Sequence, residues 1–139
     1  MPVIKLPARQ EPVVAICDFT YADVVSGTYS ACVDLPLGAI VTRGNLFITT
    51  LFNSATTDTF SIGDQVGSSA ATATTYSATS ADITATGNAV TVVPNGIKTT
   101  SQTTVGVVWT GTGAAPTAGV GKLVIEYIIV GKEDSTYDL

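Results

Sequence analysis

The sequence predicts an all-β protein: a single-domain β-sandwich, jelly-roll-like, with an extended N-terminal arm. Runs rich in Val, Ile, Thr, Phe and Tyr recur along the chain, and turn signals separate them roughly every 8–15 residues. No segment shows the spacing of apolar residues that an amphipathic helix requires. The 139 residues fit one domain with one hydrophobic core.

The predicted arm, residues 1–12, differs from the rest of the chain in its proline content, with Pro2, Pro7 and Pro12. Proline disfavours both helices and central strands, so we expect an extended segment. Its apolar side chains cannot be buried by a free tail, which favours an arm that lies on a neighbouring subunit. A frayed terminus is the alternative. The sandwich domain then covers residues 13–131, and residues 132–139 form an acidic tail.

The first predicted strands are residues 13–21 and 29–33, with a turn at Ser26-Gly27 between them. Pro36 and Gly38 predict a tight turn after the second strand, because proline presets φ and glycine permits unusual backbone angles.

Two strong runs follow at residues 39–42 and 46–53, interrupted by Arg43-Gly44-Asn45. Both faces of the second run are partly apolar, which indicates a central strand. A short strand at residues 59–62 is expected to end at Gly63-Asp64.

Residues 65–92 are rich in Thr, Ser and Ala, and we expect loops and strands there because threonine fits strands better than helices. Gly87-Asn88 predicts a turn between strands at residues 82–86 and 89–93, and Pro94-Asn95-Gly96 predicts the next turn. Residues 103–110 and 122–130 are two of the clearest strands. In the first of these, Trp109 shares a face with Val105 and Val107, so we expect it in the core. The total is eight or nine strands.

The charge pattern argues against nucleic-acid binding. The net charge is −5, and the 6 basic residues are scattered rather than clustered. Charged residues make up only 12% of the chain. A surface with few long charged side chains is easily buried against a partner, which indicates an assembling protein. A plain threonine-rich β-domain is the alternative.

The chain contains no histidine, so it lacks the commonest general base and metal ligand. Asp58 and Asp64 flank the short strand at residues 59–63, and we expect turn and cap roles for them instead of a glycosidase pair. No Asp-x-Asp-x-Asp-Gly pattern supports a calcium site. We therefore expect no enzyme, no cofactor and no metal.

Cys17 and Cys32 lie on strands that could be neighbours, so a disulfide is conceivable. Two buried thiols are the favoured interpretation. The N-terminus has no apolar leader segment, which predicts synthesis in a cytoplasm.

Three stretches carry a resemblance to a known family: residues 34–41 with Leu35-Pro36-Leu37-Gly38, residues 47–53, and residues 58–64 ending in Gly63-Asp64. A turn of this kind leading into a Thr-rich strand, with a Gly-Asp strand end after it, resembles small virion proteins of tailed bacteriophages. The class that the chain most resembles is the capsid decoration, or cement, protein.

This resemblance implies a protein made in the host cytoplasm that sits on the outer capsid surface. There it would bind subunits of the major capsid protein as a homo-oligomer, with a trimer favoured and a dimer possible. The resemblance carries no catalytic residue. On this hypothesis the arm contacts the capsid through the apolar Val3, Ile4 and Leu6 and the salt-sensitive Lys5 and Arg9.

Two other functions stay open. One is a receptor- or carbohydrate-binding module of a head or tail fibre, which would need exposed aromatic side chains. The candidates are Tyr21, Tyr29, Tyr76 and Tyr137. The other is a head-completion or tail-tube protein, which usually has a longer loop or a helix.

Overall fold

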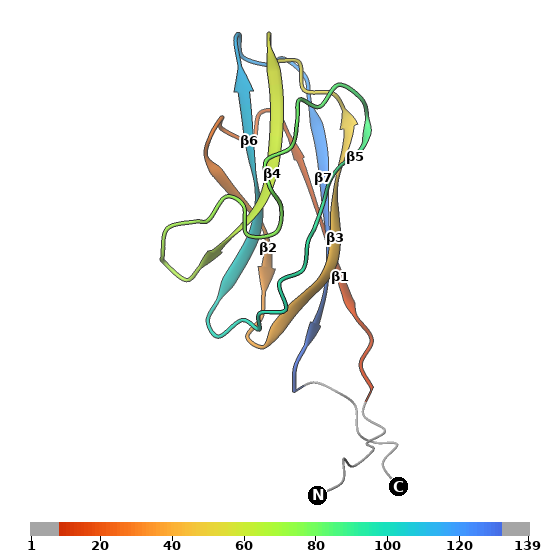
Figure 1. The fold of residues 1–139 in the computed structure, drawn as a ribbon, viewed down its shortest axis with the longest axis vertical. Coiled ribbons are helices and arrows are strands. Elements are labelled where there is room, and N and C mark those ends of the chain that lie inside the picture. Colours follow the sequence, from red (N-terminus) through yellow and green to blue (C-terminus); the bar gives the residue numbers. More distant parts are fainter. Residues whose placement is uncertain (1–8, 132–139) are drawn as a thin grey trace, which may run out of the picture.

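A computed structural model describes residues 9–131, and these form two antiparallel sheets packed face to face (Figure 1). Residues 1–8 and 132–139 lie outside the described part of the chain. The predicted β-sandwich is confirmed. Within residues 9–131 there is no helix long and apolar enough to cross a membrane.

One sheet has four strands in the order β1-β7-β3-β5, and the other has three in the order β2-β6-β4. The strand bounds are β1 (Val13–Thr20), β2 (Tyr29–Leu35), β3 (Ala39–Thr50), β4 (Thr57–Val66), β5 (Gly87–Thr91), β6 (Thr103–Thr112) and β7 (Val120–Ile129). This is the strand order of a jelly roll in which residues 72–83 stand in for an eighth strand beside β4.

Residues 72–83 follow the edge of β4 without forming a regular strand. Their main-chain N–H groups donate to β4 carbonyls at four points: Thr72 to Asp64, Tyr76 to Ile62, Ser80 to Phe60 and Ile83 to Asp58. These points are three or four residues apart, whereas a paired strand advances by two. Side-chain oxygens supply the missing acceptors, because the β4 N–H groups donate to Ser77, Ser80 and Asp82. The edge of β4 is therefore covered, which gives the Ser-rich composition a structural purpose.

The predicted break at Arg43-Gly44-Asn45 is wrong, because β3 runs unbroken from Ala39 to Thr50. The pairing register with β7 shifts between Val41 and Arg43, so the irregularity is a bulge inside the strand. Gly44 is not a turn residue. A Cβ there would lie 2.5 Å from the carbonyl oxygen of Val124, so only glycine permits this close approach of the two strands.

The predicted strand end at Gly63-Asp64 is also wrong, since β4 continues to Val66. Gly63 is required because residues 72–83 cross directly over it. A Cβ on Gly63 would overlap the carbonyl oxygen of Thr72, which accepts a 3.0 Å hydrogen bond from the N–H of Asp64.

The region after β4 holds fewer strands than expected, so the described chain has seven rather than eight or nine. Gly87 and Asn88 begin β5 instead of forming a turn, and residues 82–86 are not a strand. The competing interaction is a side-chain hydrogen bond to β4: the carboxylate of Asp82 accepts a 2.8 Å hydrogen bond from the N–H of Asp58. That side-chain bond replaces the main-chain pairing of a strand.

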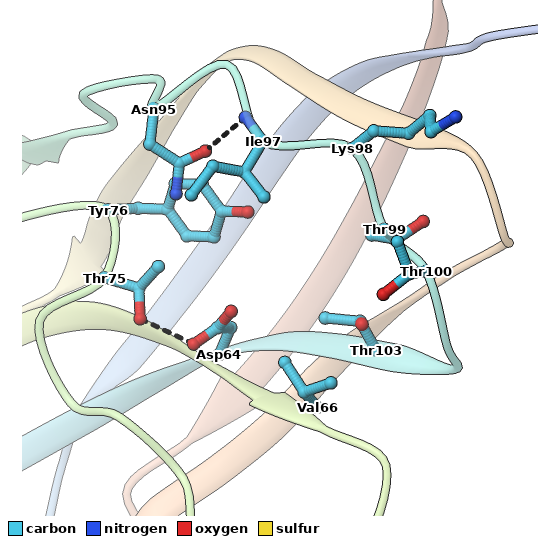
Figure 2. A pocket seen from close by; sticks show the side chains of 10 residues that line it. All are labelled: Asp64, Val66, Thr75, Tyr76, Asn95, Ile97, Lys98, Thr99, Thr100 and Thr103. Atoms are coloured by element: carbon cyan, nitrogen blue, oxygen red, sulfur yellow. Dashed lines mark hydrogen bonds between the residues drawn. The ribbon is translucent and has the colours of Figure 1, made fainter.

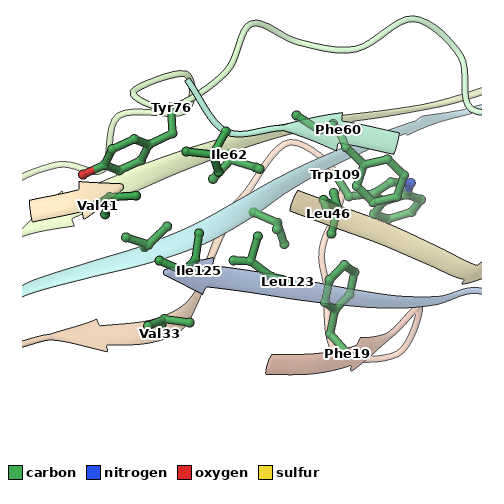
Figure 3. Close-up of a cluster of buried hydrophobic side chains, with 14 of the residues drawn as sticks. Phe19, Val33, Val41, Leu46, Phe60, Ile62, Tyr76, Trp109, Leu123 and Ile125 are labelled. Carbon is green, nitrogen blue, oxygen red and sulfur yellow. The ribbon is translucent and has the colours of Figure 1, made fainter. Parts of the chain in front are cut away.

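The core lies between the two sheets, and alternate side chains of each strand enter it (Figure 3). The predicted alternation in β6 is confirmed, because Val105, Val107 and Trp109 are all buried. The largest fully buried side chains are Phe60, Leu46, Ile48, Ile62, Leu123, Ile125, Val105 and Val107.

Four aromatic rings gather at one end of this core. The ring of Phe52 lies 5.1 Å from that of Phe60, 5.5 Å from that of Trp109 and 6.3 Å from that of Phe19, measured between centroids. Such tilted and edge-to-face contacts add to the free energy gained from burial. The predicted core position of Trp109 is confirmed, and its indole N–H donates a 2.9 Å hydrogen bond to the carboxylate of Asp58.

Gly63→Ala tests the crossing of residues 72–83 over β4. We expect a loss of about 3 kcal/mol in the free energy of unfolding, because the new methyl group overlaps main-chain atoms that cannot move aside cheaply. Urea unfolding followed by Trp109 fluorescence measures it.

Gly27→Ala is the matched control. Gly27 has a φ of +74° and open space around its Cα, so alanine there meets only backbone strain, worth about 1 kcal/mol. Equal losses in the two variants would contradict the proposed crossing.

Candidate interaction surface and pockets

Of the predicted capsid-contacting residues, the structure describes only Arg9, which is exposed. Val3, Ile4, Lys5 and Leu6 lie outside the described residues. The neighbouring Gln10 holds this part of the chain against β7. Its side-chain amide donates to the carbonyl oxygen of Ile129 and accepts from the N–H of Ile129, each at 2.6 Å. The amide thus imitates a paired main chain and extends the contact between this segment and β7.

Strand β1 is an edge strand, because it pairs with β7 on one side only. Tyr21 continues that pairing by donating its N–H to Gly119, while the N–H of Thr20 points away from β7, to Asp23. Backbone groups alternate along a strand, so those of Val14 and Ile16 also point away from β7. An edge of this kind can accept a further strand.

Two neighbouring outer side chains of this edge, those of Val14 and Ile16, are apolar. Val14 and Ile16 are 53% and 60% exposed, and Ile16 is paired with Val124 of β7. We name Val14, Ile16 and Val124 the β1–β7 patch. An exposed apolar edge is typical of a surface that a partner covers.

Two ion pairs flank the β1–β7 patch. Lys122 lies 3.6 Å from Asp18 on one side, and Arg43 lies 2.8 Å from Glu126 on the other. The hydrogen bond from Arg43 lowers the pKa of Glu126. Charged pairs around an apolar centre match the usual division of an interface into a core and a rim.

A first pocket, of about 220 Å³, lies between the end of β4 and residues 95–100 (Figure 2). Its polar groups largely engage one another: Thr75 donates to the carboxylate of Asp64, and the N–H of Ile97 donates to Asn95. Tyr76 lines the pocket but is only 4% exposed. The prediction that Tyr76 is exposed is therefore wrong, because its N–H bonds β4 and its ring is drawn between the sheets.

A second pocket, of about 520 Å³, lies near the opposite end of the sandwich, beside the aromatic cluster. Its lining is mainly apolar and includes Val24, Trp109 and Pro116. Tyr21 also lines the pocket, and 39% of the Tyr21 surface is exposed. The hydroxyl oxygen of Ser54 is buried there without a hydrogen-bond partner. Tyr21 is thus the most exposed aromatic candidate among the described residues.

Asp58 and Asp64 do not flank a strand, as was expected, but lie within β4. Asp58 is buried and accepts from the N–H of Ser54 at 3.0 Å as well as from Trp109, so it holds a loop and a ring in place. Both carboxylates are thus engaged with neighbouring donors. Residues 9–131 contain no group of three or more His, Cys, Asp or Glu side chains that could hold a metal ion.

Tyr29 is half-buried at the start of β2, where its ring covers Gly106. Its hydroxyl group forms a 2.8 Å hydrogen bond with that of Thr104. Burial raises the pKa of Tyr29 to about 12. Because one face of the ring rests on β6, Tyr29 is a poor stacking platform for a sugar.

The comparisons with known proteins concern the fold. No protein-family model and no curated protein matches the sequence. A chain of the solved structure "Cyanophage Pam1 capsid asymmetric unit" has a similar fold, with a TM-score of 0.60 and 18% identity. The match covers 93% of this chain and 91% of that chain. The two chains therefore share one architecture over nearly their full lengths.

The raised pKa of Tyr29 predicts a loss of stability at alkaline pH. The phenol of the unfolded chain ionises near pH 10, whereas that of the folded chain stays protonated to about pH 12. Between these values the unfolded chain binds fewer protons, so the free energy of unfolding falls as pH rises. Tyr29→Phe should reduce this fall in urea unfolding measured at successive pH values.

Part of the fall should persist in Tyr29→Phe, because burial also raises the pKa of Tyr76. From about pH 7 to 9 the two proteins should change in parallel, since their phenols stay protonated there. Identical curves above pH 10 would refute the role of Tyr29.

Proposed function

We propose that the chain is a phage virion structural protein that decorates the outer surface of the capsid and stabilises it by binding subunits of the major capsid protein. The observation that carries the proposal is the similarity in fold to a chain of a phage capsid asymmetric unit, over 93% of one chain and 91% of the other. Fold alone does not fix function, so the proposal also requires a surface on this chain that suits binding to a capsid subunit.

The β1 edge is the part of the surface that best suits binding to a capsid subunit. Its outer side chains Val14 and Ile16 are exposed and apolar, and the predicted arm of residues 1–12 leads directly into it. A capsid segment that pairs with β1 would gain main-chain hydrogen bonds, and the β1–β7 patch would give it apolar contacts. The Gln10 contact with Ile129 fixes where the arm leaves the sandwich.

Charge supports an outer location. A chain with a net charge of −5 is repelled by packaged DNA and has no reason to bind it. The proposal assigns the chain no catalytic step, no cofactor and no metal. Its synthesis in the host cytoplasm and its place on the outer face of the virion are parts of the same proposal.

We also propose that the protein acts as a homo-oligomer, with a trimer favoured over a dimer. Several copies of one weak site gain avidity when they engage a symmetric shell together. The sugar-binding alternative has less support, because Tyr76 is buried and Tyr29 rests on β6.

Ile16→Asp tests the β1–β7 patch. Ile16 is 60% exposed, so the variant should fold, while a carboxylate in an apolar contact is costly to desolvate. We expect at least a tenfold loss of affinity, about 1.4 kcal/mol, for capsids of the encoding phage assembled without this chain. Co-sedimentation measures it.

Val93→Asp is the matched control, because Val93 is 66% exposed and follows β5, at the far side of the sheet from β1. It should bind like the unmodified chain. Deletion of residues 1–8 tests the arm separately, and full affinity after that deletion would remove the arm from the proposal. If neither the chain nor its variants bind capsids, the proposed function is wrong.

Light scattering at neutral pH tests the oligomeric state. We expect a mass of about three chains, or of two if the symmetric unit is a dimer. A monomer at all concentrations would contradict the proposed homo-oligomer in solution, and a glycan-binding screen would then test the sugar-binding alternative.

A further inference from the structure

The two cysteines lie on the same open side of the sandwich. Cys17 belongs to β1 and Cys32 to β2, and each of these strands is an edge strand of its own sheet. The strands contact one another although they share no ladder. Both side chains are partly buried and pack against the core, and both are free thiols. The sequence placed them on neighbouring strands; the structure places them on edge strands of different sheets.

Each thiol donates to a carbonyl oxygen of its own strand, Cys17 to Asp18 at 3.9 Å and Cys32 to Ser30 at 3.6 Å. Burial, and next the neighbouring Cys17, raise the pKa of Cys32 to about 12. Cys32 lies at a bulge in β2. The register between β2 and β6 passes from Ala31 to Val33, so Cys32 is left out of the pairing and departs from the regular alternation of side chains.

We propose that Cys17 and Cys32 are a redox-responsive pair, which closes to an intramolecular disulfide when the folded protein meets a low-molecular-weight disulfide oxidant. The bond would join the edges of the two sheets at the side where no further strand covers them in residues 9–131. This inference is independent of the proposed capsid function.

The chemistry is thiol–disulfide exchange with oxidised glutathione as the oxidant. The Cys17 thiolate attacks one glutathione sulfur, which forms a mixed disulfide and releases one reduced glutathione. Cys32 then loses its proton and attacks the Cys17 sulfur, which releases the second glutathione. Two protein thiols are oxidised, and one molecule of oxidised glutathione is reduced to two thiols. Cys17 is the better first nucleophile because the raised pKa of Cys32 keeps that thiol protonated.

The bond would act mainly on the unfolded chain. It closes a loop of about 15 residues, which restricts the unfolded ensemble more than the folded state. It also keeps β1 and β2 from separating, and edge strands are the elements that open first. We therefore expect the melting temperature of the oxidised protein to exceed that of the reduced protein by about 10 °C.

The experiment uses the full-length protein, reduced and then incubated with oxidised glutathione. Intact mass spectrometry should show a loss of about 2 Da, for the two hydrogens removed, and thiol titration after denaturation should find no free thiol. A non-reducing peptide map should contain one cross-link, from Cys17 to Cys32. The melting temperature is measured on the same two samples, so it needs no variant.

Cys17→Ser and Cys32→Ser are the matched controls, and each should lose the intramolecular bond and the rise in melting temperature. Four outcomes would overturn the proposal: both thiols remain free in the folded protein, stable glutathione adducts accumulate, the bond joins two chains, or the bond forms without any rise in melting temperature. Capsid binding is not part of this test, so failure here leaves the proposed function untouched.

Discussion

The hydrogen bond between the Trp109 indole and the buried Asp58 carboxylate organises one end of the sandwich. It joins neighbouring strands β6 and β4, and the same carboxylate holds the Ser54 N–H in the loop before β4. The bond fixes the plane of the Trp109 ring, against which Phe52 packs. Removing either partner would leave the other buried without its hydrogen bond, which is more costly than the net worth of the bond itself.

The aromatic cluster imposes a second requirement, because each ring needs a flat surface to lie on. A Cβ on Gly119 would lie 2.6 Å from the Phe52 ring, one on Gly111 would lie 2.5 Å from the Trp109 ring, and one on Gly121 would overlap Phe19. These glycines are in or beside the loop between β6 and β7. The end of β6, the start of β7 and the loop between them therefore form a packing surface for the aromatic rings.

Sequence reasoning reached the fold class and the clearest strands, because alternation such as Val105-Gly106-Val107-Val108-Trp109 depends only on neighbouring residues. It failed at Gly44, Gly63 and Gly87, which were all taken as strand-ending signals. Glycine serves turns and close approaches of two segments equally well, and only the neighbouring segment in the folded chain distinguishes the two roles. The contacts of Ser77 and Ser80 with β4 join segments far apart in the sequence, so no local pattern could indicate them.

The candidate surface was less predictable than the fold. The run at residues 13–21 is visibly a strand, but its place at the edge of a sheet follows from the order β1-β7-β3-β5, which one sequence does not contain. The exposure of Ile16 follows from that order. The placement of Cys17 and Cys32 on edge strands of different sheets follows from the sheet order, and the bulge at Cys32 from the pairing of β2 with β6. Tyr76, by contrast, was misjudged because side-chain anchoring of residues 72–83 draws it inward.

The irregular cover on β4 also limits how copies of this protein can grow into larger structures. An open filament requires two complementary free edges on every copy, one to offer and one to receive. Here residues 72–83 occupy one side of the three-stranded sheet, and β5, with five residues, is a short edge on the same side of the molecule. Within residues 9–131 the edges left free, those of β1 and β2, therefore lie on the other side of the sandwich. Copies that meet through this one side pair with each other instead of adding on in two directions, which disfavours fibres.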